Sequence, residues 1–238
     1  MVMITETTKT FTYDFPRPSV TVDVVVFAIL TGKLQILLIR RLHEPFAGYW
    51  ALPGGFLEID EDIESAARRE LAEETALADL YLEQLYSFGK PGRDPRGRTI
   101  TVAYYALLSA DKAGETFAGD DAAEAQWFGI EQLPNLAFDH DEIIRCAIER
   151  LKGKVQYTAV AFHLLPQVFT FTQLQQVYES IWQKSLDRRN FRKWINNFDM
   201  LIDTGKKQNS GRRPARLYRV NPDISAATTL HKLQNRKT

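Results

Sequence analysis

Three glutamates in one short stretch have the types and spacing needed to bind a metal ion. Glu70 and Glu74 are four residues apart and share one face of a predicted helix, and Glu73 lies one step round it. Such stacked carboxylates repel one another unless a cation lies between them. Mg²⁺ and Mn²⁺ prefer oxygen ligands and are commonly held by one or two carboxylates together with phosphate oxygens of a substrate. The stretch therefore predicts a divalent metal site for a diphosphate-containing ligand.

The residues around these glutamates resemble the Nudix box, Gly-x5-Glu-x7-Arg-Glu-U-x-Glu-Glu-x-Gly-U, in which U is a bulky aliphatic residue. The chain departs from this pattern at Ala76, where the family has Gly and where a helix would end with positive φ. The alternative interpretation is an ordinary solvated acidic helix. The matching positions are Gly55, Glu61, Arg69, Glu70, Leu71, Glu73, Glu74 and Leu77.

This resemblance implies a Nudix fold, a mixed β-sheet between helices, that binds a nucleoside diphosphate linked to another group. It implies Glu70 and Glu74 as the main ligands of Mg²⁺ or Mn²⁺ and Glu73 as an auxiliary ligand. It also implies that Arg69 pairs with Glu61 or Glu73 and so holds the preceding loop on the helix. The same three glutamates, Glu70, Glu73 and Glu74, would be the catalytic residues if the domain is hydrolytic.

The charge of the 238-residue chain is divided unequally along its length, although the net charge is zero. Residues 1–154 hold 16 Lys and Arg against 25 Asp and Glu, a net charge of −9. Residues 155–238 hold 14 against 5, a net charge of +9. This asymmetry predicts two domains with different partners, the second suited to a polyanion. The predicted divisions are an N-terminal arm at 1–19, the Nudix domain at 20–154 and a second domain at 155–238.

Composition also bears on the compartment. The single Cys146 cannot form an internal disulfide, which favours a reduced setting. The N-terminus lacks a basic segment followed by an apolar run, and the sequence has no apolar stretch of 18 residues. The expectation is a cytoplasmic protein without a membrane partner.

The first domain reads as strands and helices around the box. Two apolar strands at 20–30 and 33–41 are joined at Thr31-Gly32, a hairpin signal. A Gly/Pro-rich loop at 89–98 carries four cations and suits phosphate, although it could equally be a solvated connection. The domain is completed by a box helix at 62–74, strands at 81–88, 99–108 and 123–128, and a helix at 139–151. The predicted contacts to a phosphate-bearing ligand are Arg40, Arg41, Phe46, Gly54, Gly55, Arg93, Arg96 and Arg98.

The second domain reads as a winged helix-turn-helix. Thr172 to Gln175 has the form of a capping box that opens a helix, and Asp187 is a candidate N-cap for a basic helix at 188–198. Cations in the first turn of that helix oppose its dipole, so an anionic partner explains them better than stability does. Strands at 201–204 and 216–220 would flank a basic wing. The predicted DNA contacts are Arg188, Arg189, Asn190, Arg192, Lys193, Lys206, Lys207, Arg212 and Arg213; a basic helical bundle that binds RNA, membrane or nothing is the alternative.

The order of box, basic loop and winged helix resembles the NrtR family of Nudix-related transcriptional regulators. The residues that carry this resemblance lie in four segments: Gly92 to Arg98, Leu136 to His140, Leu186 to Arg192, and Gly211 to Arg219. It implies a homodimeric repressor of NAD-metabolism genes that binds a palindromic double-stranded DNA operator. Its Nudix domain would sense ADP-ribose, or a related nucleotide, and release DNA on binding it.

An enzyme remains the alternative: a Mg²⁺-dependent Nudix hydrolase, an ADP-ribose pyrophosphatase with an accessory basic domain. The intact carboxylates of the box favour hydrolysis, and the basic second domain favours a regulator. A hydrolase also needs a base to activate water. The sequence does not single one out among Glu115, Asp120, Asp121 and Glu124.

Overall fold

The computed structural model of the chain describes residues 12–113, 122–209 and 214–224. None of the helices in these ranges is both long and apolar enough to cross a membrane. The elements in chain order are β1 (Ser19–Leu30), β2 (Lys33–Arg41), β3 (Trp50–Ala51), β4 (Gly54–Phe56), α1 (Ile63–Thr75), β5 (Tyr81–Phe88), β6 (Thr99–Leu108), β7 (Ala122–Gly129), α2 (His140–Lys154), the 3₁₀ helix η2 (Val160–Leu164), β8 (Phe169–Thr170), α3 (Phe171–Trp182), α4 (Arg188–Asn196), β9 (Leu201–Gln208) and β10 (Ala215–Val220).

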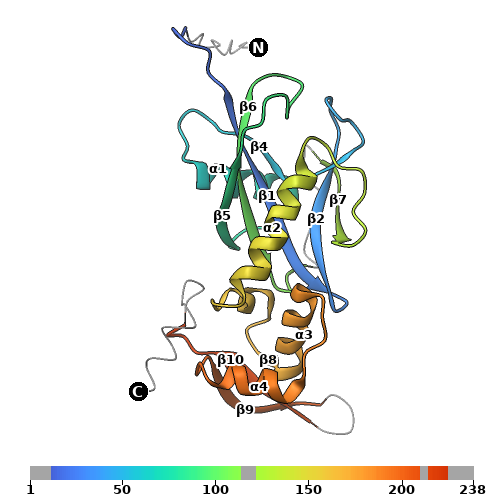
Figure 1. The fold of residues 1–238 in the computed structure, drawn as a ribbon, viewed down its shortest axis with the longest axis vertical. Helices are drawn as coiled ribbons and strands as arrows, with labels where there is room; N and C mark the ends of the chain where they lie inside the picture. The colour runs from blue at the N-terminus through green and yellow to red at the C-terminus, as the bar shows by residue number, and fades with distance from the viewer. Residues whose placement is uncertain (1–11, 114–121, 210–213, 225–238) are drawn as a thin grey trace, which may run out of the picture.

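A mixed sheet forms the larger part of the molecule (Figure 1). Its strands follow the order β3-β2-β1-β6-β5, with β4 pairing with β1 and β7 pairing with β2. β1 runs parallel to β6 and antiparallel to β2. The predicted β1–β2 hairpin is confirmed, because Thr31 and Gly32 both have positive φ, as its two-residue turn requires.

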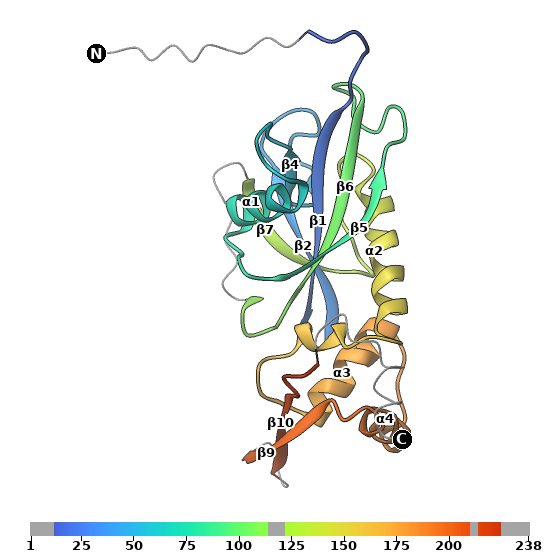
Figure 2. The ribbon, with the colours of Figure 1, turned by 90° about the vertical axis from the view of Figure 1, so that its left-hand side faces the viewer.

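Helices cover both faces of this sheet, which lies between α1 and α2 (Figure 2). Side chains alternate along β1, so Val24 and Val26 pack with Ala67 and Leu71 of α1 in one core cluster. Val25 and Phe27, on the opposite face, belong to the cluster formed by α2. That second cluster continues without interruption into α3 and α4, which means the two halves of the chain share one core.

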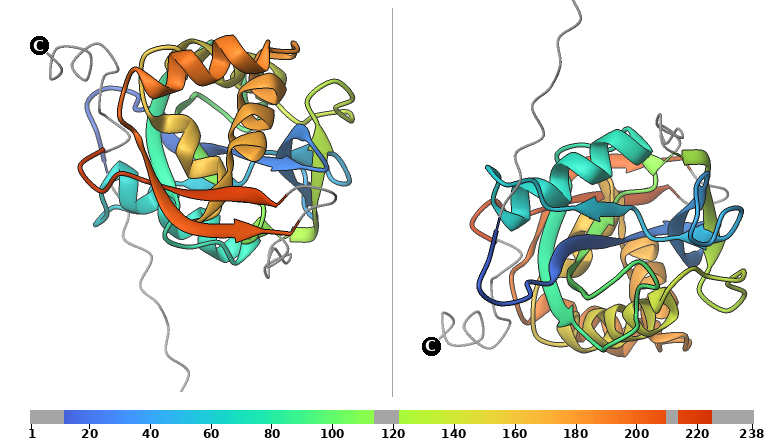
Figure 3. Two further views of the ribbon diagram at one scale, coloured as in Figure 1. Left: turned by 90° about the horizontal axis from the view of Figure 1, so that it is seen from below. Right: turned by 90° about the horizontal axis from the view of Figure 1, so that it is seen from above.

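The C-terminal part is a winged helix, as predicted. α3 and α4 lie beside a three-stranded sheet of order β8-β10-β9, and Figure 3 shows this arrangement from below. The basic helix begins at Arg188 behind the N-cap Asp187, whose side chain accepts the N–H of Asn190 at 2.8 Å. The predicted arrangement, a helix pair followed by a two-stranded wing, is therefore confirmed.

The capping box lies two residues earlier than predicted. It is formed by Thr170 and Gln173, and α3 begins at Phe171. Phe171 is buried and packs on Phe191 with ring centres 5.6 Å apart, whereas Thr172 is exposed. Thr170 with Gln173 and Thr172 with Gln175 both fit the capping-box pattern. The helix starts at the earlier pair because that places Phe171 inside the helix on its buried side.

Two element ends in the second domain differ from the predictions. α4 ends at Asn196 rather than at residue 198, and β9 continues to Gln208 rather than stopping at residue 204. The extension of β9 comes from pairing, because Gln208 lies opposite Ala215 of β10. A polar stretch of low strand propensity is held in the ladder by its neighbour.

Candidate functional site

The glycine loop before α1 holds its backbone against two carboxylates of the helix. The N–H of Gly54 donates to Oε2 of Glu74 at 2.8 Å. A Cβ atom at Gly55 would lie 2.3 Å from Oε1 of Glu70, and one at Gly54 would lie 2.1 Å from the carbonyl oxygen of Val22. A side chain at residue 54 would collide with backbone atoms, whereas one at residue 55 would force the Glu70 carboxylate to move.

Arg69 joins the loop to the helix, as predicted, and contacts more partners than expected. Its guanidinium donates to Glu61 at 2.6 Å, to Glu70 at 2.8 Å and to Glu73 at 3.1 Å. These partners, led by Glu61, raise the pKa of Arg69. The same group donates to the carbonyl of Phe56 at 3.2 Å, so one cation fixes loop, helix start and helix middle together.

Glu70 and Glu74 form a desolvated carboxylate pair. Burial raises the pKa of Glu74 to about 8, and the neighbouring charges of Glu70 and Asp23 act in the same direction. Burial likewise raises the pKa of Glu70, although Arg69 opposes the shift. A divalent cation would relieve this cost, so the donor set fits Mg²⁺ or Mn²⁺.

Glu73 differs from the other two box glutamates. Its side chain is 58% exposed and is paired with Arg69. Across the described ranges, no three His, Cys, Asp or Glu side chains come together as a metal-binding group. The protein therefore offers two close carboxylates, and further oxygen ligands would have to come from a bound phosphate.

Ala76 ends α1 in the left-handed conformation, with φ 58° and ψ 15°. Its N–H donates to the carbonyl of Ala72. The departure from the box pattern therefore leaves the expected helix exit in place, at the energetic cost of a Cβ in this region.

A cavity of about 120 Å³ lies beside the glycine loop. Two arginines of the cavity contact the Phe138 ring. The Arg41 guanidinium lies 5.0 Å from the ring centre, and the Arg96 guanidinium lies 5.6 Å from it. Burial lowers the pKa of Arg41, and the charge of Arg96 lowers it further. An anion bound in the cavity would offset the repulsion between these two cations. The lining residues are Thr21, Asp23, Arg41, Leu52, Gly54, Gly55, Phe56, Arg93, Asp94, Arg96, Phe138 and His140.

Arg93 lies in the same wall but is already paired. Its side chain is 4% exposed, and its guanidinium donates to both carboxylate oxygens of Asp139, at 2.6 and 2.9 Å. It also lies 3.4 Å from Asp23. Arg93 thus braces the cavity, whereas Arg96 is held by buried Asp94 and keeps a side chain that is 42% exposed.

Sequence reasoning missed several residues of this site. Asp23 and His140 line the cavity and contact each other, with His140 Nε2 3.4 Å from Asp23 Oδ1. Phe138, Asp139 and His140 belong to a segment that carried the family resemblance, which was the available signal. Asp23 lies within an apolar strand pattern, where only its being a carboxylate between valines sets it apart.

Three predicted ligand contacts lie elsewhere. Arg40 donates to the carbonyl of Gly48 and lies 4.0 Å from Glu124, both side chains being half exposed. Phe46 lines a neighbouring cavity of about 350 Å³ and packs on Phe138, with ring centres 4.9 Å apart. Arg98 donates to the carbonyl of Gly89. Of the candidate bases, Glu124 lies on β7, and Glu115, Asp120 and Asp121 lie outside the described residues.

The second candidate site is the outer face of α4. Phe191 and Ile195 bury one side of this helix, which leaves the polar side exposed. Arg192 is also exposed, and its guanidinium lies over the Phe171 ring, 4.4 Å from its centre. Lys206 and Lys207 are exposed on β9, while Arg212 and Arg213 lie outside the described residues. The exposed polar residues at the start of α4 are Arg188, Arg189, Asn190, Arg192 and Lys193.

Comparison with known proteins identifies both parts. Residues 20–150 match the NUDIX domain family, and residues 161–220 match the NrtR DNA-binding winged helix domain. The chain is 40% identical over 210 residues to the ADPR responsive transcriptional repressor NtrR of Acinetobacter baylyi, covering 87% of this chain and 83% of that protein. It is 44% identical over 129 residues to the ADP-ribose pyrophosphatase of Methanocaldococcus jannaschii, covering 54% of this chain and 72% of that enzyme.

Two solved structures are also similar. Shewanella oneidensis NrtR complexed with a 27mer DNA superposes with a TM-score of 0.77 at 38% identity, covering 88% of this chain and 98% of that one. The NUDIX domain of the same protein complexed with ADP ribose gives a TM-score of 0.51 at 38% identity, covering 58% and 94%.

The fold and the two sites define a Nudix domain joined to a DNA-binding winged helix. Among proteins of this class, the chain belongs to the NrtR family of Nudix-related transcriptional regulators.

Proposed function

We propose that this protein is a transcriptional repressor of NAD-metabolism genes that binds ADP-ribose, or a related nucleotide, in its Nudix domain and then releases DNA. The observation that carries the proposal is the exposed cationic face of α4 on the same chain as the Arg41 and Arg96 cavity. The similar repressor of Acinetobacter baylyi and the two Shewanella oneidensis structures support both halves.

The cavity suits a diphosphate. Arg41 and Arg96 would donate charge-assisted hydrogen bonds to its oxygens, and the Phe138 ring offers a flat apolar surface to a base or a ribose. Glu70 and Glu74 would hold a divalent cation, which would supply positive charge to offset that of the phosphates. Arg93 would act through its neighbours, by fixing Asp23 and Asp139 in the wall.

The α4 face suits duplex DNA. Arg188, Arg189 and Asn190 at the helix start would enter the major groove, where Arg reads guanine and Asn reads adenine. Lys206 and Lys207 of the wing would contact phosphates. A homodimer would place two such helices about one helical turn apart on a palindromic operator.

A gel shift tests this function: the full chain is mixed with duplex DNA from the promoter of an NAD-synthesis gene, with and without ADP-ribose. The expected result is a specific complex at moderate salt that ADP-ribose dissociates. A complex no tighter than that with unrelated DNA would refute the repressor function.

Hydrolysis is the second candidate function, favoured by the carboxylate pair of Glu70 and Glu74 and by the similar pyrophosphatase. Bound metal would polarise the diphosphate and activate water for attack on phosphorus. The test is Mg²⁺-dependent release of AMP from ADP-ribose. AMP release by the wild-type protein that is lost in Glu70→Gln would support an enzyme. No AMP release by the wild-type protein would mean that the Nudix domain only binds the nucleotide.

A further inference from the structure

Helix α3 is tied to the Nudix domain at two points. The hydroxyl of Ser180 donates to the carbonyl of Gly32, in the turn between β1 and β2, at 2.9 Å. The indole Nε1 of Trp182 donates to the carbonyl of Lys152, in the last turn of α2, at 3.1 Å. α3 is therefore held by two different elements of the first domain.

Both of these elements begin at the nucleotide cavity. The hairpin carries Asp23 and Arg41 at the cavity and Gly32 at its far end. Helix α2 carries His140 at the cavity, and Lys152, which accepts from Trp182, lies about 18 Å further along the helix. Figure 1 shows both elements running down to α3. A shift at the cavity end of a hydrogen-bonded hairpin or a helix moves its other end as well.

The opposite side of α3 carries α4. Tyr178 packs on Phe191 and Trp194, with ring centres 5.2 and 5.4 Å apart. Trp182 packs on Trp194 at 6.2 Å. Trp182 thus contacts the end of α2 and the DNA-facing helix at once, so a rotation of α3 is passed directly to α4.

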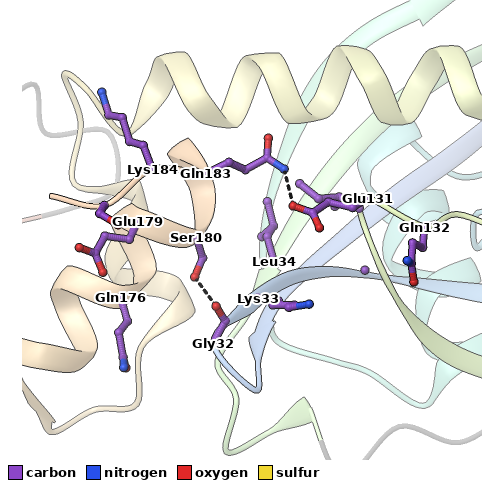
Figure 4. A pocket seen from close by; sticks show the side chains of 13 residues that line it. Gly32, Lys33, Leu34, Glu131, Gln132, Gln176, Glu179, Ser180, Gln183 and Lys184 are labelled. Carbon is purple, nitrogen blue, oxygen red and sulfur yellow. Dashed lines mark hydrogen bonds between the residues drawn. The ribbon is translucent and has the colours of Figure 1, made fainter.

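The hairpin contact is surrounded by open space. A cleft of about 540 Å³ separates α3 from the hairpin turn and from residues 129–132 (Figure 4). Besides Ser180, only the bond from Gln183 to Glu131, at 3.4 Å, crosses this cleft among its lining residues. The apolar face of α3 stays in the core that it shares with α2, but its cleft side is little packed, so a small shift of α3 meets little resistance there.

From these relationships we infer that Ser180 and Trp182 are positioning residues that carry the state of the nucleotide cavity to α4. Through its hydrogen bond to Gly32, Ser180 makes α3 follow the position of the β1–β2 turn, and through its bond to Lys152, Trp182 makes α3 follow the end of α2. This inference rests on the proposed function, because it describes how ADP-ribose would change the affinity for DNA.

The test compares two double variants of the full chain. Ser180→Ala/Trp182→Phe removes both donors and keeps an aromatic ring at 182. The matched control, Ser185→Ala/Trp127→Phe, changes a serine that lines the same cleft and an indole that donates to Ala113 within the Nudix domain. For each protein we would measure the Kd for ADP-ribose without DNA by calorimetry, and the Kd for operator DNA with and without saturating ADP-ribose.

The measured quantity is the ratio of the Kd for DNA with ADP-ribose to the Kd without it. We expect this ratio to be at least about fivefold smaller for Ser180→Ala/Trp182→Phe than for the wild-type protein, and unchanged for the control. The two separate affinities should each change by less than about threefold, because neither residue lines the cavity or the outer face of α4. A merely structural role would lower DNA affinity equally with and without ADP-ribose, and that result would overturn the inference. If ADP-ribose has no effect on DNA binding by the wild-type protein, the proposed function fails together with the inference; a wild-type effect that the variant retains in full overturns the inference alone.

Discussion

The imidazole of His140 bridges the backbone of Leu52 and the side chain of Asp23. Its Nδ1 accepts the N–H of Leu52 at 2.8 Å, and its Nε2 lies 3.4 Å from Oδ1 of Asp23. Arg93 approaches the other oxygen of the same carboxylate, also at 3.4 Å. A single buried carboxylate therefore connects β1, the basic loop and the start of α2 at the cavity wall.

Replacing Asp23 with Asn should destabilise the fold in a pH-dependent way. Burial raises the pKa of Asp23, but His140 and Arg93 lower it more, so it falls below the ordinary 3.8. The contribution of the carboxylate is then complete above pH 3.8 and is lost as the pH falls through the folded-state pKa. Urea unfolding at neutral pH should show a loss of about 3–5 kcal/mol for Asp23→Asn, as for other broken buried pairs.

In acid, the difference in the free energy of unfolding between Asp23→Asn and the wild-type protein should become smaller. The exposed Asp111→Asn serves as the control and should match wild type throughout. A difference that stays constant from neutral pH to below 3.8 would show that the charge of Asp23 does not matter.

Removing Arg96 should weaken effector binding more than removing Arg98. Arg96 lies at the cavity beside Phe56 and Phe138, whereas Arg98 donates to the carbonyl of Gly89 outside it. Loss of a charge-assisted hydrogen bond predicts a fall in ADP-ribose affinity of about 10- to 100-fold for Arg96→Ala. Calorimetric titration measures both variants. Equal losses would mean that the loop acts only through its total charge.

A methyl group added at residue 55 should displace the Glu70 carboxylate. The new Cβ would lie 2.3 Å from Glu70 Oε1, so the carboxylate would have to move away from residue 55. Gly55→Ala should therefore reduce ADP-ribose affinity by about tenfold or more, equivalent to roughly 1.4 kcal/mol. Gly97→Ala is the control, because a Cβ there meets no atom within 4 Å. Unchanged affinity in Gly55→Ala would argue against Glu70 as part of the site.

Arg189 tests the DNA-facing side of α4. If it reads a base edge, Arg189→Ala should cost about 1–3 kcal/mol and relax the sequence preference at one operator position. Competition gel shifts with single-base operator variants measure this, and Arg145→Ala, an exposed arginine on α2, should change nothing. A loss that is uniform across all sequences would show that Arg189 contacts phosphate only.

Ala76 should be a site where glycine stabilises the protein. Its φ of 58° is costly for a residue with a Cβ, so Ala76→Gly should raise stability by about 1 kcal/mol and the Tm by about 2–4 °C. Ala72→Gly, in the interior of the same helix, should lower stability by about the same amount. A lower Tm for Ala76→Gly would contradict this account of the helix end.

The sequence by itself determined the features that depend on near neighbours. The spacing of Glu70 and Glu74, the pairing of Arg69 with Glu61, and the helix end at Ala76 were all predictable, and so were strands β5 and β6 with their boundaries. The glutamate spacing and the strands follow from helix and strand period, whereas the Arg69 pairing and the helix end were implied by the resemblance to the Nudix box.

The tertiary structure alone decided which polar residues meet. It separated Arg96, at the cavity, from Arg93, which is buried and paired, although both lie in one basic loop. It brought Asp23 to His140, and it chose Thr170 over Thr172 as the helix cap. These outcomes depend on strand order and on which side chains are excluded from water, and contacts between distant segments leave no period in the sequence.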